Sequence, residues 1–123
     1  MGFVPVYFSG SAGAIRTYAH LDALKALLPT PARVVGLADS GFYLDLDIFT
    51  PLKRFVVVPE GQNASAMLGR ACKAKHSGQL EKCLIASVSA GNIQTPVFGW
   101  QSEYDLDQRG CEMTRACAAS AVQ

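Results

Sequence analysis

The stretch Phe8-Ser9-Gly10-Ser11-Ala12-Gly13-Ala14 decides the expected fold. An apolar run over residues 4–8 precedes it and a helix-like stretch follows, so Ser11 falls where a strand turns sharply into a helix. This is the geometry of a nucleophile elbow, which needs tiny flanking residues and aims helix amides at developing negative charge. The pattern keeps only the last glycine of the G-x-S-x-G motif. Similar short sequences also occur in flexible loops and in ordinary strand-to-helix turns, so these remain alternative interpretations.

The segment after this turn predicts a strand–helix–strand unit. Apolar residues recur every three or four positions over residues 14–28, which is typical of an amphipathic helix, and Pro29 ends it. Residues 33–39 then predict a short buried strand. Parallel strands joined by a helix have their carboxyl ends at one edge of the sheet, so Ser11 and Asp39 are expected to lie near each other.

The later segments carry weaker signals. Residues 40–49 are aromatic and acidic without a clear period and predict a long loop that lines a cleft. Residues 60–71 look helical, residues 72–83 form a polar connection between two cysteines, and residues 95–101 resemble another strand. Asp105 follows that strand, where an α/β hydrolase keeps the carboxylate that orients its histidine, and no histidine follows it in the sequence.

The composition indicates one soluble globular domain. The chain has 123 residues, half of them hydrophobic, and a formal net charge of +1. Its basic residues are spread along the chain, so nucleic acid is not an expected partner. Neither a membrane-spanning run nor a signal peptide is visible. Because the chain begins almost directly with a strand, we expect a fragment that lacks preceding sequence.

The cysteines favour oxidation over metal binding. Four are present, Cys72, Cys83, Cys111 and Cys117, and this number is compatible with disulfides or with reduced thiols. Their spacing makes no paired C-x-x-C motif, and His76 has no matching partner, so no metal site is expected. The sequence does not decide the state of the last two cysteines.

Several separated motifs together resemble the pectin acetylesterase and Notum family. The resemblance covers residues 4–108 and leaves residues 109–123 as a divergent tail. The most specific motif is the ten-residue run after the second expected strand. The motifs are Ser9-Gly10-Ser11-Ala12-Gly13-Ala14, His20-Leu21-Asp22, Gly36-Leu37-Ala38-Asp39-Ser40-Gly41-Phe42-Tyr43-Leu44-Asp45, Thr95-Pro96-Val97-Phe98, and Tyr104-Asp105 with Gln108.

The resemblance implies a partial α/β-hydrolase-like domain over residues 1–123 with parallel strands and a nucleophile elbow. It implies a secreted or cell-wall carboxylesterase without metal or cofactor, whose substrate is an acetylated polysaccharide such as pectin or an acylated protein. By the same resemblance Ser11 is the nucleophile, Asp105 the triad acid and Ala12 an oxyanion-hole donor. Asp39 supports the site, and Cys72 with Cys83 matches the bracketing cysteines of the family and implies a disulfide.

The chain departs from the family pattern in three ways. Ala14 replaces the second glycine after the serine, and the oxyanion-hole glycines and tryptophan upstream of the elbow strand are not found. The catalytic histidine of the family lies well beyond the aspartate and has no counterpart here, since His20 is expected to pack and His76 to be solvated. The alternative is therefore a truncated, catalytically incomplete member of the family. The sequence does not indicate the oligomeric state.

Overall fold

A three-stranded parallel sheet organises the computed structural model, which describes residues 5–46 and 50–109. Its strands are β1 (Val6–Gly10), β2 (Val35–Asp39) and β3 (Val97–Trp100), in the order β1-β2-β3. Residue 8 of β1 pairs with residue 37 of β2, and residue 37 with residue 98 of β3, so the strands are in register and their carboxyl ends share one edge. The expected α/β class is confirmed.

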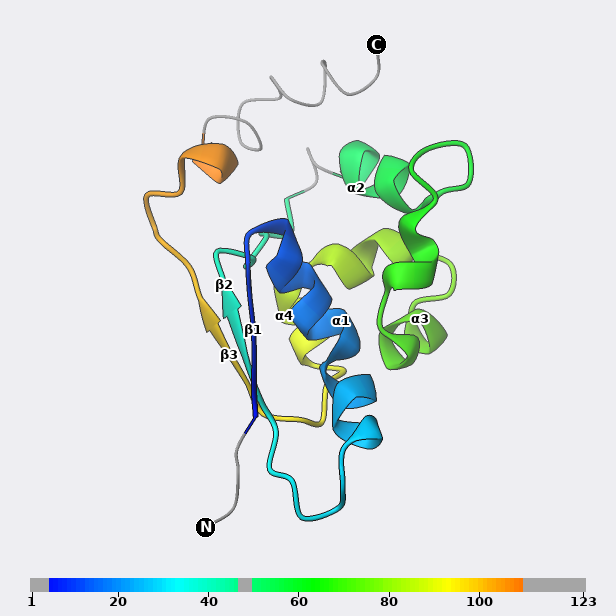
Figure 1. The fold of residues 1–123 in the computed structure, drawn as a ribbon. Helices are drawn as coiled ribbons and strands as arrows, with labels where there is room; N and C mark the ends of the chain where they lie inside the picture. Colours follow the sequence, from blue (N-terminus) through cyan, green and yellow to red (C-terminus); the bar gives the residue numbers. More distant parts are fainter. Residues whose placement is uncertain (1–4, 47–49, 110–123) are drawn as a thin grey trace.

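Helix α1 (Ala12–Leu27) covers one face of this sheet, and α4 (Ala86–Ala90) lies on the same side (Figure 1). A β-carbon at Gly36 of β2 would lie only 2.6 Å from the Leu21 side chain, so glycine lets α1 approach the sheet closely. The buried residues of α1 recur at helical spacing and form its sheet-facing side: Ala14, Thr17, Tyr18 and Leu21.

A second layer of short helices packs beyond α1 on the side away from the sheet (Figure 1). It contains α2 (Thr50–Val57), α3 (Arg70–Lys75) and two 3₁₀ segments, Ala64–Met67 and Leu80–Leu84. A disulfide joins Cys72 to Cys83 with a Cα–Cα distance of 5.9 Å, as the resemblance implied. Both cysteines are buried in one apolar cluster with Val57 and Leu68.

The helical prediction for residues 60–71 is wrong. The structure has only the 3₁₀ turn Ala64–Met67 there, and α3 begins at Arg70. Leu68 and Gly69 have extended backbones, with ψ of 148° and 131°, and these torsions interrupt the helix. The polar connection predicted for residues 72–83 is in turn mostly helical. Residues 40–46 form the expected irregular loop, while residues 47–49 lie outside the described part.

One face of the sheet is exposed at the two outer strands, β1 and β3, whereas β2, the strand predicted to be buried, has no exposed residue. On the face away from α1, four large apolar side chains are 57–63 % exposed: Val6, Phe8, Phe98 and Trp100. Parallel sheets are usually covered on both faces. Within residues 5–46 and 50–109, this sheet is covered only where α1 and α4 pack.

Within the described residues, no helix is both long enough and apolar enough to cross a membrane.

Asp22 ties α1 to the start of β3. Its carboxylate accepts hydrogen bonds from the backbone N–H groups of Gln94, at 3.1 and 3.2 Å, and of Thr95, at 2.8 Å. Burial alone raises the pKa of Asp22, but the hydrogen bonds from Thr95 and Gln94 outweigh it, so this pKa lies below its ordinary value. The folded chain therefore favours the ionised form of Asp22.

The lowered pKa of Asp22 predicts a loss of stability in acid. A carboxyl group whose pKa is depressed by folding stabilises the fold above its unfolded pKa, and this contribution is lost as the pH falls through the folded pKa. We expect the free energy of unfolding to fall below about pH 4. Asp22→Asn should lower it by about 1 kcal/mol at pH 7 and weaken the acid dependence.

Urea unfolding at pH 7 and at acidic pH measures both effects. The exposed Asp107 is the matched control, because its carboxylate accepts no hydrogen bond within the described residues. Asp107→Asn should leave the pH dependence intact. An Asp22→Asn chain with the acid dependence of the wild type would contradict the assignment.

Candidate active site

Ser11 has a strained backbone at the junction of β1 and α1. Its φ of 54° and ψ of −132° lie in a region that non-glycine residues rarely adopt. The Ser11 N–H donates to the Asp39 carbonyl oxygen at 2.8 Å, and the Ser11 carbonyl accepts from the Ala14 N–H at 2.8 Å. These bonds hold the elbow, residues 10–12, between the end of β2 and the first turn of α1. The predicted sharp strand-to-helix turn is confirmed.

Two glycines make room for the elbow. A β-carbon on Gly13 would lie 2.2 Å from the Ser9 hydroxyl oxygen. A β-carbon on Gly41, in the loop after β2, would lie 2.2 Å from the Ala14 β-carbon and 3.2 Å from the Ser11 carbonyl. Ala14 itself has an ordinary negative φ within α1, so it replaces the expected glycine without strain. Sequence reasoning missed the role of Gly41, although the specific ten-residue motif contains it.

The first turn of α1 directly follows Ser11, so its backbone N–H groups lie next to the elbow. The first amides of a helix, here including that of Ala12, have no intrahelical acceptor and carry the positive end of the helix dipole. The Ser11 side chain makes no capping hydrogen bond and is exposed. A negatively charged oxygen beside the Ser11 hydroxyl would therefore be within the field of these amides.

Asp39 contacts the elbow through its backbone. Its carbonyl oxygen binds the Ser11 N–H, while its carboxylate accepts a hydrogen bond from the Ser40 hydroxyl at 2.9 Å. Ser40 also has a positive φ, 54°, and its N–H donates to the Trp100 carbonyl at 2.7 Å. The expected proximity of Ser11 and Asp39 is confirmed, and the contact between them is a main-chain hydrogen bond.

Asp105 presents an oriented carboxylate after β3. Its Oδ1 accepts from the backbone N–H groups of Asp107 at 2.9 Å and Gln108 at 3.0 Å, and its Oδ2 accepts from the Gln101 side chain. The hydrogen bond from the Gln108 backbone contributes most to a pKa of Asp105 below its ordinary value, and the other donors add to it against partial burial. The group is thus an anion at neutral pH.

Ser11 and Asp105 follow two strands that end at the same edge of the sheet. The strand between them is β2, so the ends of β1 and β3 lie about 10 Å apart, which is two strand spacings. The loop after β2 bridges the interval. Its Phe42 N–H donates to Gln101 Oε1 at 2.9 Å, and its Phe42 carbonyl accepts from Gln108 Nε2 at 3.3 Å.

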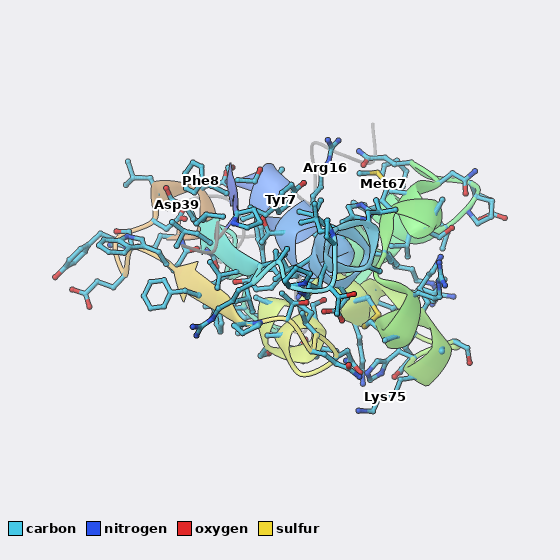
Figure 2. The ribbon with its side chains drawn as sticks, turned by 60° about the horizontal axis from the view of Figure 1, so that its bottom comes forward. Tyr7, Phe8, Arg16, Asp39, Met67 and Lys75 are labelled. Carbon is cyan, nitrogen blue, oxygen red and sulfur yellow. A yellow bond between two sulfur atoms is a disulfide. The ribbon has the colours of Figure 1, made fainter. Side chains whose placement is uncertain are left out.

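Neither histidine of the chain lies at the elbow. His20 is nine residues beyond Ser11 on α1, about 13 Å along the helix axis, and lines a hollow of about 880 Å³ between α1 and α3. His76 follows α3, and Figure 2 shows its neighbour Lys75 on the opposite side of the molecule from Asp39. The described ranges contain no cluster of three histidine, cysteine or acidic side chains that could bind a metal ion.

The fold and this edge of the sheet define a class of protein. It is an α/β protein with a strained serine between a parallel strand and a helix, and with a carboxylate at the same sheet edge. The Pectinacetylesterase family model matches residues 6–122. The chain therefore belongs to the pectinacetylesterase family.

The chain is also similar in sequence to two plant proteins. Pectin acetylesterase 4 of Arabidopsis thaliana is 34% identical over 102 residues, which cover 80% of this chain and 24% of that protein. Pectin acetylesterase 5 of the same plant is 31% identical over 102 residues, which cover 80% of this chain and 23% of that protein. The chain thus spans about a quarter of the length of these relatives.

The strain at Ser11 predicts an unusual order of stabilities. Glycine tolerates the torsions of this position and alanine does not, so Ser11→Gly should be more stable than Ser11→Ala by about 1 kcal/mol. At the exposed helical Ser87 the order should reverse, because glycine is about 1 kcal/mol worse than alanine inside a helix. Thermal and urea unfolding of the four variants measures both differences. The same order at both positions would contradict a strained elbow.

Proposed function

We propose that this chain carries the nucleophile and the acid of a serine carboxylesterase that removes acetyl groups from an acetylated polysaccharide such as pectin. The observation that carries the proposal is the strained Ser11, exposed at the N-terminus of α1. Membership of the pectinacetylesterase family supports the acetyl ester as substrate. We further propose that residues 1–123 are part of a larger α/β-hydrolase-like domain, since the relatives are about four times longer than the matched region.

In the proposed reaction the Ser11 hydroxyl attacks the ester carbonyl carbon and loses its proton to an imidazole. The Ala12 amide is a donor to the tetrahedral oxyanion, and one such donor contributes roughly 3 to 4 kcal/mol in comparable enzymes. Collapse of the intermediate breaks the bond to the sugar oxygen, which takes the proton from the imidazolium and leaves as a hydroxyl, while the acetyl group stays on Ser11. Water then attacks this acyl-enzyme and releases acetate.

Asp105 is the triad acid in the proposed mechanism. Its ionised carboxylate would orient the imidazole and stabilise the imidazolium that forms. The positions of His20 and His76 disfavour both as this base. We therefore propose that the imidazole comes from outside these 123 residues. Asp39 supports the site through its carbonyl contact with the Ser11 N–H.

The proposed location is the cell wall or extracellular space. Disulfides persist in oxidising compartments, and the Cys72–Cys83 bond fits such a location. The relatives are named for pectin acetyl esters, which supports a polysaccharide substrate. The sequence motifs also resemble Notum, so an alternative form of this proposal is that the enzyme removes an acyl group from a protein and not from a polysaccharide.

The protein expressed from its intact gene tests the proposal. A fluorophosphonate probe should label Ser11, identified by peptide mass spectrometry, and the protein should release acetate from acetylated pectin. Ser11→Ala should abolish both labelling and release, and Asp105→Asn should lower kcat by about 10⁴-fold. The exposed Ser87→Ala is the control and should behave like the wild type. Undiminished acetate release by Ser11→Ala would overturn the proposal.

A catalytically incomplete remnant is the second candidate, and the distance of His20 from Ser11 along α1 favours it for the isolated chain. Triads without their base retain only residual activity. We expect purified residues 1–123 to hydrolyse p-nitrophenyl acetate no faster than their Ser11→Ala variant. A clear excess of the wild type would show that His20 or His76 supports catalysis.

A further inference from the structure

The side chain of Gln101 connects two segments at the carboxyl edge of the sheet. Gln101 directly follows β3 and is half-buried. Its Oε1 accepts a hydrogen bond from the Phe42 N–H at 2.9 Å, in the loop after β2. Its Nε2 donates to Asp105 Oδ2. One amide group therefore joins this loop to the carboxylate.

The two partners determine the orientation of the Gln101 amide. The Phe42 N–H can only donate, and an ionised carboxylate can only accept. A flipped amide would place N–H against N–H and oxygen against oxygen. Only one arrangement satisfies both partners, so the side chain is held at both ends.

Gln101 binds the second oxygen of the Asp105 carboxylate. The backbone N–H groups of Asp107 and Gln108 both bind Oδ1, so they hold only one of the two oxygens. The Gln101 side chain donates to the other oxygen, Oδ2, and the Gln108 side chain also helps to lower the pKa of Asp105. The buried Gln108 side chain ties the same segment to the Phe42 carbonyl.

The connection continues to the elbow through main-chain hydrogen bonds. The Ser11 N–H binds the carbonyl of Asp39 at the end of β2, and the next residue, Ser40, binds the Trp100 carbonyl at the end of β3. The loop then reaches Phe42 and Gln101. A continuous path thus leads from the strained serine to the carboxylate.

We propose that Gln101 is a positioning residue, which fixes the orientation of the Asp105 carboxylate relative to Ser11. This inference rests on the proposed function, in which these two residues are the triad acid and nucleophile. Gln101 contacts neither the substrate nor the reacting atoms in this assignment. It acts through Asp105 and through the loop after β2.

Two variants in the 123-residue chain separate the two contacts of Gln101. Gln101→Leu removes both, whereas Gln101→Glu keeps an acceptor for the Phe42 N–H and replaces the donor with a second carboxylate. The titration of Asp105, followed by carbon-detected NMR, should shift upward in both variants, and hydrogen exchange at Phe42 should accelerate only in Gln101→Leu. The exposed Gln62→Leu is the matched control and should change neither. An unchanged Asp105 titration in both Gln101 variants would overturn the inference.

Kinetics of the protein expressed from its intact gene test the effect on catalysis. Both Gln101 variants should lower kcat for acetyl ester hydrolysis by roughly 10- to 100-fold, with KM within about twofold, because a misplaced catalytic group slows the chemical step. Gln62→Leu should match the wild type. Wild-type kcat in the Gln101 variants, together with an inactive Asp105→Asn, would overturn the positioning role alone. An active Asp105→Asn would overturn the proposed function and this inference with it.

Discussion

The strained backbone of Ser11 is the constraint on which the rest of the site depends. A serine with φ of 54° and ψ of −132° persists only where its surroundings hold it there. The Asp39 carbonyl binds its N–H and the Ala14 N–H binds its carbonyl. Both contacts require β2 and α1 to be in place. The strand–helix–strand unit therefore fixes the elbow at the N-terminus of α1.

The remaining elements extend this constraint to Asp105. Gly36 allows α1 to pack closely on β2, and Asp22 on α1 binds the backbone that leads into β3. The segment after β3 then turns toward the loop after β2, where Gln101 holds Asp105. The ionised Asp105 carboxylate is therefore held in a defined orientation after β3, at the sheet edge where Ser11 follows β1.

The sequence predicted those parts of the fold that local patterns specify. The tiny residues around Ser11, the helical period of α1 and the proline that follows it all act locally, and the structure confirms the elements they predicted. The disulfide came from the family resemblance. Helix α2 and the break at Gly69 were missed because such short elements depend on packing around Cys72 and Cys83. The hydrogen bond between Gln101 and Phe42 joins residues 59 positions apart in sequence, and no local pattern reveals it.

A crystal structure of the intact protein after reaction with a fluorophosphonate tests the central claim most directly. The account predicts a phosphorus atom bonded to the Ser11 hydroxyl oxygen, a positive φ at Ser11, and a phosphonyl oxygen within hydrogen-bond distance of the Ala12 N–H. It also predicts the Asp105 carboxylate on the same side of the sheet edge. A negative φ at Ser11, or a phosphonyl group bonded to a different residue, would contradict it.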